Sequence, residues 1–149
     1  MLKTLGVIFI VLIVLFVGAI TFTFFVGSKL KSEAKAYVDS TVPILVKDWD
    51  PNELKSRANK NMLANTNDSN LNNIYSVYKK LGKMTKYIGS NGNAIKMLNG
   101  PDGIKATAQY IITAQFENGI ATITLGLFKV NESWEISSIY INSPLFLTK

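Results

Sequence analysis

Hydrophobic and polar residues follow three different patterns along this chain. An uninterrupted apolar run, Leu5 to Gly27, comes first and contains no charged side chain. Over about 28–82, apolar residues recur every three or four positions, which is typical of amphipathic helices. From Lys83 onward they alternate with polar residues, which is typical of strands with one buried face. These patterns predict two parts: residues 1–27 as an N-terminal transmembrane anchor and residues 28–149 as a single α+β domain.

The apolar run matches a bilayer in length. A helix over it spans about 30 Å, the thickness of the hydrocarbon core. The alternative is a cleaved signal peptide, because Val17-Gly18-Ala19 offers small residues to a peptidase. The apolar stretch continues past that point to Val26, so we favour an uncut signal-anchor. The flanking lysines by themselves slightly favour a cytoplasmic domain. A short chain with one small domain behind its anchor is nevertheless typical of export, and we expect an exported domain.

Helical spacing after the anchor predicts about three helices. The first covers Ser28 to Lys47, with Pro43 kinking or dividing it. Its two faces are an apolar one (Leu30, Ala34, Tyr37, Val38, Thr41, Leu45) and a polar one (Lys31, Lys35, Asp39).

The second and third helices carry clear start and stop signals. Asp50 is placed to cap the second helix, with Pro51 at its first position and Glu53 three residues after the cap. The third helix begins at about Asn70, and Gly82 is placed to end it. The expected buried residues are Leu54, Ala58 and Met62 in the second helix and Leu71, Ile74, Tyr75, Val77, Tyr78 and Leu81 in the third.

Alternation and turn residues predict an antiparallel sheet of four to five strands. The first two strands, Met84–Ile88 and Ala94–Leu98, are short and are separated by a turn at Ser90-Asn91-Gly92-Asn93. Three long strands follow over 104–116, 120–130 and 134–141, joined by turns at 117–119 and 131–133. Because an apolar sheet face must be covered, the helices are expected to pack on it. The fold class is α+β, with about three helices on a curved antiparallel sheet, cystatin-like or nuclear-transport-factor-2-like.

Several short motifs resemble those of an uncharacterised family of small bacterial membrane-anchored proteins. These motifs are Trp49-Asp50-Pro51, Leu81-Gly82-Lys83, Phe116-Glu117-Asn118-Gly119, Trp134-Glu135-Ile136 and Ile141-Asn142-Ser143. They are structural motifs and transfer no catalytic residue. The resemblance implies an exported domain of cystatin-like or nuclear-transport-factor-2-like fold. It agrees with a single-pass protein of the bacterial inner (cytoplasmic) membrane whose C-terminal domain is periplasmic.

Composition excludes several common chemistries. The chain has no His and no Cys, so it has neither Ser-His nor Cys-His catalysis, no zinc site of the usual type and no lipidated cysteine. No glycine pattern suits a phosphate loop. We expect no cofactor and no metal. The net charge is +6, of which +5 belongs to residues 28–149. This balance suits anionic lipid or an acidic partner, and no recognition motif supports nucleic acid.

Three groups of residues are candidates for a site. Lys79, Lys80, Lys83 and Lys86 crowd the end of the third helix and the next strand, where they complement the helix dipole or form a partner or lipid contact. Tyr110 and Tyr140 lie on long strands and line a cavity or pack in the core. Asp48, Asp50 and Glu53 surround the start of the second helix, where acids complement the dipole or form a weak Ca²⁺ site.

The resulting functional hypothesis is a non-enzymatic membrane-anchored domain. It would be an accessory or assembly subunit that binds another protein of an envelope or membrane complex, or a second copy of itself. The alternative is a carrier that holds a small apolar ligand or lipid between sheet and helices. An enzyme with tyrosines in a cone-shaped cavity ranks third, because the strands carry no Asp to work with them.

Overall fold

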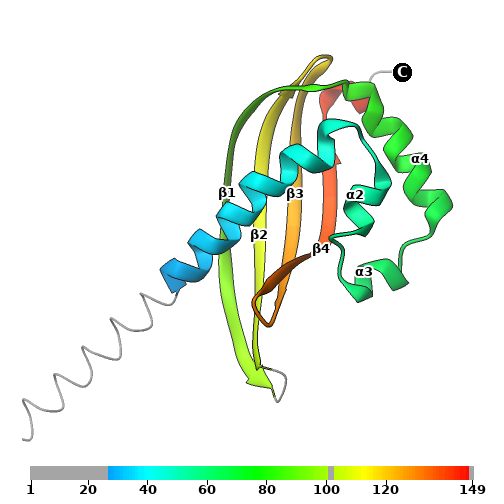
Figure 1. The fold of residues 1–149 in the computed structure, drawn as a ribbon. Helices are drawn as coiled ribbons and strands as arrows, with labels where there is room; N and C mark the ends of the chain where they lie inside the picture. The colour runs from blue at the N-terminus through cyan, green and yellow to red at the C-terminus, as the bar shows by residue number, and fades with distance from the viewer. Residues whose placement is uncertain (1–26, 101–102, 148–149) are drawn as a thin grey trace, which may run out of the picture.

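The structure is a computed structural model that describes residues 27–100 and 103–147. It confirms an α+β fold in which one antiparallel sheet, in the order β1-β2-β3-β4, is covered on one face by helices (Figure 1). A helix over 27–47 comes first in the described chain. The labelled elements are α2 (Pro51–Lys55), α3 (Lys60–Ala64), α4 (Asp68–Tyr78), η1 (Lys79–Leu81), β1 (Met84–Gly100), β2 (Gly103–Phe116), β3 (Gly119–Val130), β4 (Ser133–Asn142) and η2 (Pro144–Leu147).

The predicted anchor, Leu5 to Gly27, lies outside the described residues except for Gly27. Among the described helices, none combines the length and apolarity that crossing a bilayer requires.

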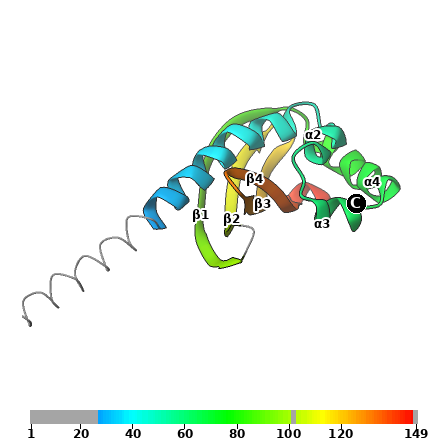
Figure 2. The ribbon, with the colours of Figure 1, turned by 60° about the horizontal axis from the view of Figure 1, so that its bottom comes forward.

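Helix 27–47 lies along the sheet, which curves around it (Figure 2). Its predicted apolar face is confirmed: the buried residues are Leu30, Ala34, Val38, Thr41, Val42, Leu45 and Val46. Of the two effects expected of Pro43, a kink or a division of the helix, the division does not occur. A proline inside a helix costs about 3 kcal/mol. Burial of Val42, Leu45 and Val46 around it recovers about 1.5–3 kcal/mol for each side chain, which is enough to keep the helix whole.

The predicted turn at Ser90-Asn91-Gly92-Asn93 is wrong. These residues continue one 17-residue strand, β1, which pairs with β2 along its whole length. The two predicted short strands therefore merge, and the sheet has four strands in the described chain. Register shifts near Tyr87 and Gly89 bend the strand without ending it. Because β2 offers a continuous partner, ladder hydrogen bonds prevail over the local turn preference of Asn-Gly.

Gly92 lies directly beneath a buried ring. A Cβ atom at this position would be 2.2 Å from the backbone oxygen of Gln109 and 2.6 Å from Cγ of Tyr110. Any larger residue would push Tyr110 out of its position. The glycine that suggested a turn is thus required for close packing in the sheet.

The predicted second helix is split in two. Asp50 caps α2 as expected, its side chain accepting a hydrogen bond from the backbone N–H of Asn52. The chain then leaves the helix at 56–59, where Arg57 and Asn59 exchange backbone hydrogen bonds of 2.7 and 2.8 Å with Ile136 of β4. Asn59 next caps α3. This pairing satisfies backbone hydrogen-bonding groups at the β4 edge of the sheet. They would stay unpaired if the helix continued.

The predicted third helix consists of α4 followed directly by η1, and it ends at Gly82, as predicted, with a positive φ of 76°. Ile74 and Val77 were expected to be buried but are exposed on its outer side.

The core forms where the inward faces of β2 and β3 meet helix 27–47 and Trp49. The Trp49 indole is buried, lies 5.4 Å from the Phe116 ring centroid, and donates a 2.8 Å hydrogen bond to the Gly82 carbonyl. At the C-terminus, Leu145 and Phe146 fold back onto the core, and Phe146 contacts Tyr78. Trp49 is therefore a core residue.

Candidate functional site

The lysine cluster, defined as Lys79, Lys80, Lys83 and Lys86, is brought together at the end of η1 and the start of β1. All four side chains are exposed. Within 27–100 and 103–147, none of their ammonium groups lies within ion-pair distance of a carboxylate. From Ser69 to Pro101 the sequence has five lysines and no acidic residue. The cluster is therefore a local concentration of unpaired positive charge.

The backbone under this cluster is held in place by the β2–β3 turn. The Lys83 N–H donates to the Glu117 carboxylate at 2.9 Å, and the Asn118 amide donates to the Lys80 carbonyl at 2.8 Å. Gly82 lies between them, and a Cβ atom there would be 2.4 Å from the Glu117 carboxylate. The lysines thus extend from a rigid segment, which lowers the entropy cost of binding through them.

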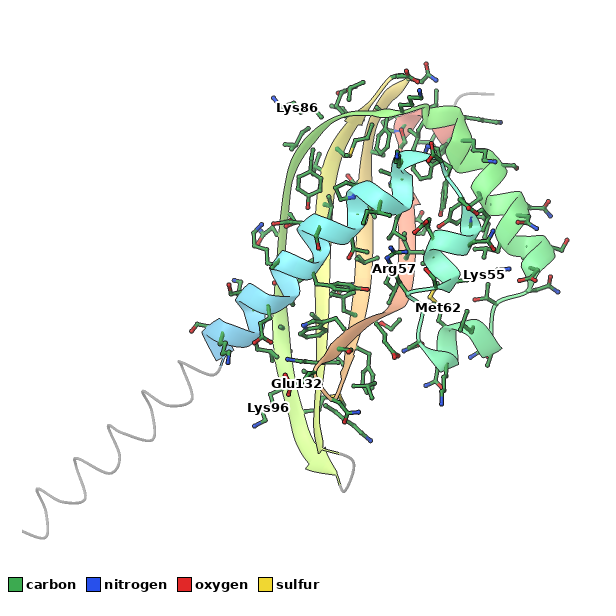
Figure 3. The ribbon with its side chains drawn as sticks, in the orientation of Figure 1. Lys55, Arg57, Met62, Lys86, Lys96 and Glu132 are labelled. Atoms are coloured by element: carbon green, nitrogen blue, oxygen red, sulfur yellow. The ribbon has the colours of Figure 1, made fainter. Side chains whose placement is uncertain are left out.

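The cluster lies far from residue 27. Helix 27–47 has about 1.5 Å of rise for each residue and is therefore about 30 Å long. Its start is near Tyr110, whose hydroxyl donates to the Lys31 carbonyl at 2.8 Å. Its end leads into Trp49, which contacts Gly82. Lys86 and Lys96 accordingly lie at opposite ends of β1, with Lys86 at the end remote from residue 27 (Figure 3).

Tyr110 and Tyr140 do not share a cavity. The Tyr110 ring is fully buried under helix 27–47, and burial raises the pKa of its hydroxyl. Tyr140 lies on the opposite face of the sheet and is 63% exposed. The alternation of β4 is shifted by an extra residue opposite Gly126 and Leu127. Tyr110 therefore packs in the core, which is one of the two roles expected of it, whereas Tyr140 is a surface residue.

The space between sheet and helix 27–47 is filled by side chains. Buried residues of β2, β3 and the helix meet there, namely Val38, Val42, Leu45, Tyr110, Ile112, Ile123 and Leu125. A small crevice lies elsewhere, between α2, α3 and α4, and is lined by Leu54, Met62 and Leu71 among others. The hypothesis of a carrier stays a prediction.

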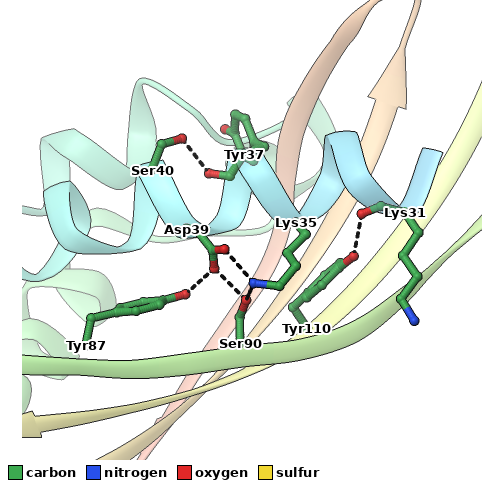
Figure 4. Close-up of polar contacts among 8 residues, drawn as sticks. All are labelled: Lys31, Lys35, Tyr37, Asp39, Ser40, Tyr87, Ser90 and Tyr110. Carbon is green, nitrogen blue, oxygen red and sulfur yellow. Dashed lines mark hydrogen bonds and ion pairs between the residues drawn. The ribbon is translucent and has the colours of Figure 1, made fainter. Parts of the chain in front are cut away.

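A cluster of polar side chains that the sequence did not reveal joins helix 27–47 to β1 (Figure 4). Asp39, expected on the solvent side of the helix, accepts hydrogen bonds from the hydroxyls of Tyr87, at 2.6 Å, and Ser90. Its other oxygen pairs with Lys35 at 2.6 Å, and Lys35 also donates to Ser90 at 3.0 Å. Asp39 thus contacts residues 48 and 51 positions away in the chain. We call Lys35, Asp39, Tyr87 and Ser90 the polar clasp.

The ionisation states of the clasp residues fit a structural role. Burial raises the pKa of the Asp39 carboxyl, but hydrogen bonds from Lys35, Ser90 and Tyr87 outweigh this effect and lower the pKa overall. Burial, together with the hydrogen bond to Asp39, raises the pKa of Tyr87 to about 12. Ser90 and Lys35 resemble a nucleophile and its base, but an ammonium paired with a carboxylate has no lone pair to accept a proton. The arrangement therefore holds the helix on the sheet.

Acidic residues stabilise the start of α2. Asp50 is the N-cap, and Glu53 lies in the first turn, where a carboxylate complements the dipole. No group of acidic residues in the described chain is arranged to hold a metal ion.

Comparison with known proteins finds no matching family model, no matching curated protein and no matching solved structure. The function is therefore inferred from the geometry of the domain itself.

Proposed function

We propose that this chain is a non-enzymatic, membrane-anchored domain that binds another protein of a bacterial envelope or membrane complex as an accessory or assembly subunit. The lysine cluster is its contact with an acidic face of that partner. The anchor is the apolar run from Leu5 to Gly27, and the domain lies on the periplasmic side of the inner membrane. The observation that carries the proposal is a rigid, exposed group of four unpaired ammonium groups.

The position of the cluster favours a protein over lipid headgroups. If the chain leaves the bilayer just before residue 27, a helix about 30 Å long separates that point from the lysines. Attraction to an anionic surface falls off within a Debye length, about 8 Å at physiological salt. Only a domain lying flat on the membrane would bring the cluster to the headgroups. An upright domain presents the cluster to a neighbouring protein.

The test is crosslinking in native membranes followed by capture of the full chain. The variant in which all four cluster lysines are replaced by Glu is expected to lose its crosslinked partner, because attraction becomes repulsion. Binding of the purified variant to vesicles that contain anionic lipid is measured in parallel. Loss of vesicle binding with an unchanged crosslinked partner would assign the cluster to lipid and refute the proposal.

Two variants with the same change in net charge separate a local effect of the lysine cluster from a general effect of net charge. Lys83→Glu/Lys86→Glu and Lys60→Glu/Lys96→Glu make the same change in net charge, and all four lysines are exposed. We expect only the first variant to weaken partner capture, by about tenfold or more. Equal losses in both variants would contradict a local docking site. Recovery of the wild-type chain from gentle detergent only as a lone monomer would refute an assembly role.

A further inference from the structure

The outer face of the sheet, defined as the side turned away from helix 27–47, carries no charge across its central rows. The strand register aligns three rows of outward residues across β1, β2, β3 and β4. These rows are Gly89–Thr113–Thr122–Asn142, Asn91–Ile111–Thr124–Tyr140 and Asn93–Gln109–Gly126–Ser138. Charged residues make up 17% of the chain and prefer the surface, so their absence from all twelve of these adjoining outward positions requires an explanation.

Large apolar side chains gather on the same face. Ile111 and Tyr140, in the middle row, are 52% and 63% exposed. Ile88, Ile95, Met97 and Ile120 are also exposed apolar residues of these strands. An uncharged face with several exposed apolar residues is typical of a protein interface.

This face has a projection and a hollow in complementary places. Tyr140 projects from β4 at one side of the middle row. A shallow hollow lies on β1 and β2 at the other side, lined by Ile88, Asn91, Ile111 and Thr113 among others. Asn91 and Tyr140 belong to the same row, three strand spacings apart, which is about 14 Å.

We propose that the outer face binds the same face of a second copy of this chain. A two-fold axis that runs along the strands between β2 and β3 brings β4 of one copy over β1 of the other. Tyr140 of each copy then lies opposite the hollow of its partner, at the same height along the strands. Such a contact is isologous and closes at two copies.

Charge favours a second copy as the occupant. The domain carries a net charge of +5, so two copies repel unless they meet through a region without charge. The three central rows meet this requirement, whereas Lys86, Lys105 and Glu135 lie in the rows beyond them. The central rows are about 19 Å wide across four strands and about 14 Å long between Gln109 and Thr113. The exposed apolar side chains of Ile88, Ile95 and Ile120 extend the patch beyond them.

Dimerisation of the purified full chain in mild detergent tests the inference. Its mass is measured by analytical ultracentrifugation across a range of concentrations. Ile111→Lys places two ammonium groups beside the two-fold axis and should raise the dimer Kd by about tenfold or more. The matched control is Ile74→Lys on α4, a similarly exposed isoleucine away from the sheet, which should leave the Kd unchanged. Mixing Ile111→Lys with Ile111→Glu copies should restore the dimer.

Crosslinking gives a second readout that does not depend on the stability of a variant. The chain has no cysteine, so single cysteines report single positions. A thiol crosslinker that spans about 10 Å, the separation of stacked sheets, should join copies of Thr124→Cys but not copies of Ile74→Cys. A monomeric wild-type chain at all concentrations, or a dimer that Ile111→Lys leaves intact, would overturn the inference. Crosslinking of Thr124→Cys in membranes only to a different protein would also overturn it. The inference is independent of the lysine cluster, because the four-Glu variant should still dimerise.

Discussion

Gly92 offers the sharpest test of how the sheet is built. Gly92→Ala places a methyl group 2.2 Å from the Gln109 backbone oxygen and 2.6 Å from Cγ of Tyr110. Overpacking of this kind costs about 1–3 kcal/mol. Displacing Tyr110 also breaks its 2.8 Å hydrogen bond to the Lys31 carbonyl, which adds about 1 kcal/mol. We therefore expect the free energy of unfolding to fall by about 2–4 kcal/mol.

The measurement is urea unfolding of the purified full chain, followed by tryptophan fluorescence. The control is Gly126→Ala on β3, where the new methyl meets the Ser138 hydroxyl, the end of a side chain that can rotate away. The expected cost there is below about 1 kcal/mol. If Gly92→Ala costs no more than Gly126→Ala, the close approach of β1 to Tyr110 is refuted. A domain of this size has about 6–18 kcal/mol of stability, so both variants should fold.

Three further outcomes concern ionisable groups. The folded chain holds Tyr87 protonated up to a pKa of about 12, so the free energy of unfolding should fall as pH rises from about 10 to 12. Tyr87→Phe should remove at most about 2 kcal/mol of that fall, as measured by urea unfolding at several pH values. The lowered pKa of Asp39 adds stability above about pH 4 that is lost as pH falls further; Asp39→Asn should cost about 1 kcal/mol at pH 7 and flatten the acid limb of the same curve. Lys129 is 7% exposed and pairs with Glu33 at 2.7 Å, so Glu33→Ala should lower the melting temperature more than Lys129→Met. Glu33→Ala leaves the buried ammonium with only its longer 3.8 Å contact to exposed Glu132 and the Trp134 ring.

Local patterns were enough to predict most elements. Strict alternation over 104–116 and 120–130 predicted β2 and β3 closely, because a strand with one buried face must alternate. The Asp50 cap and the positive φ at Gly82 were also predicted, since both depend on hydrogen bonds and backbone freedom within a few residues. The lysine cluster belongs with these features, because its members are close along the chain.

Four of the misses involve partners distant in sequence. The Asn-Gly signal at 91–92 was outweighed by pairing with β2, and the second helix was interrupted by pairing between residues 57–59 and β4. The polar clasp around Asp39 joins positions 48 and 51 residues apart, and no local spacing reveals it. The exposed position of Tyr140 depended on one extra residue in β4, which turned the later side chains to the other face.

By itself, the sequence determined which segments are helical or extended and which face of each is apolar, together with a concentration of lysines after the third helix. These properties follow from side-chain spacing and local backbone preference. The tertiary structure decided that β1 is one strand, that Tyr110 is buried under helix 27–47, and that the lysines lie about 30 Å along the helix from residue 27. It also decided that the central rows of the outer face of the sheet carry no charge. Each of these depends on contacts between residues far apart in the chain, whose free energies outweigh the local preferences at the places where the two conflict.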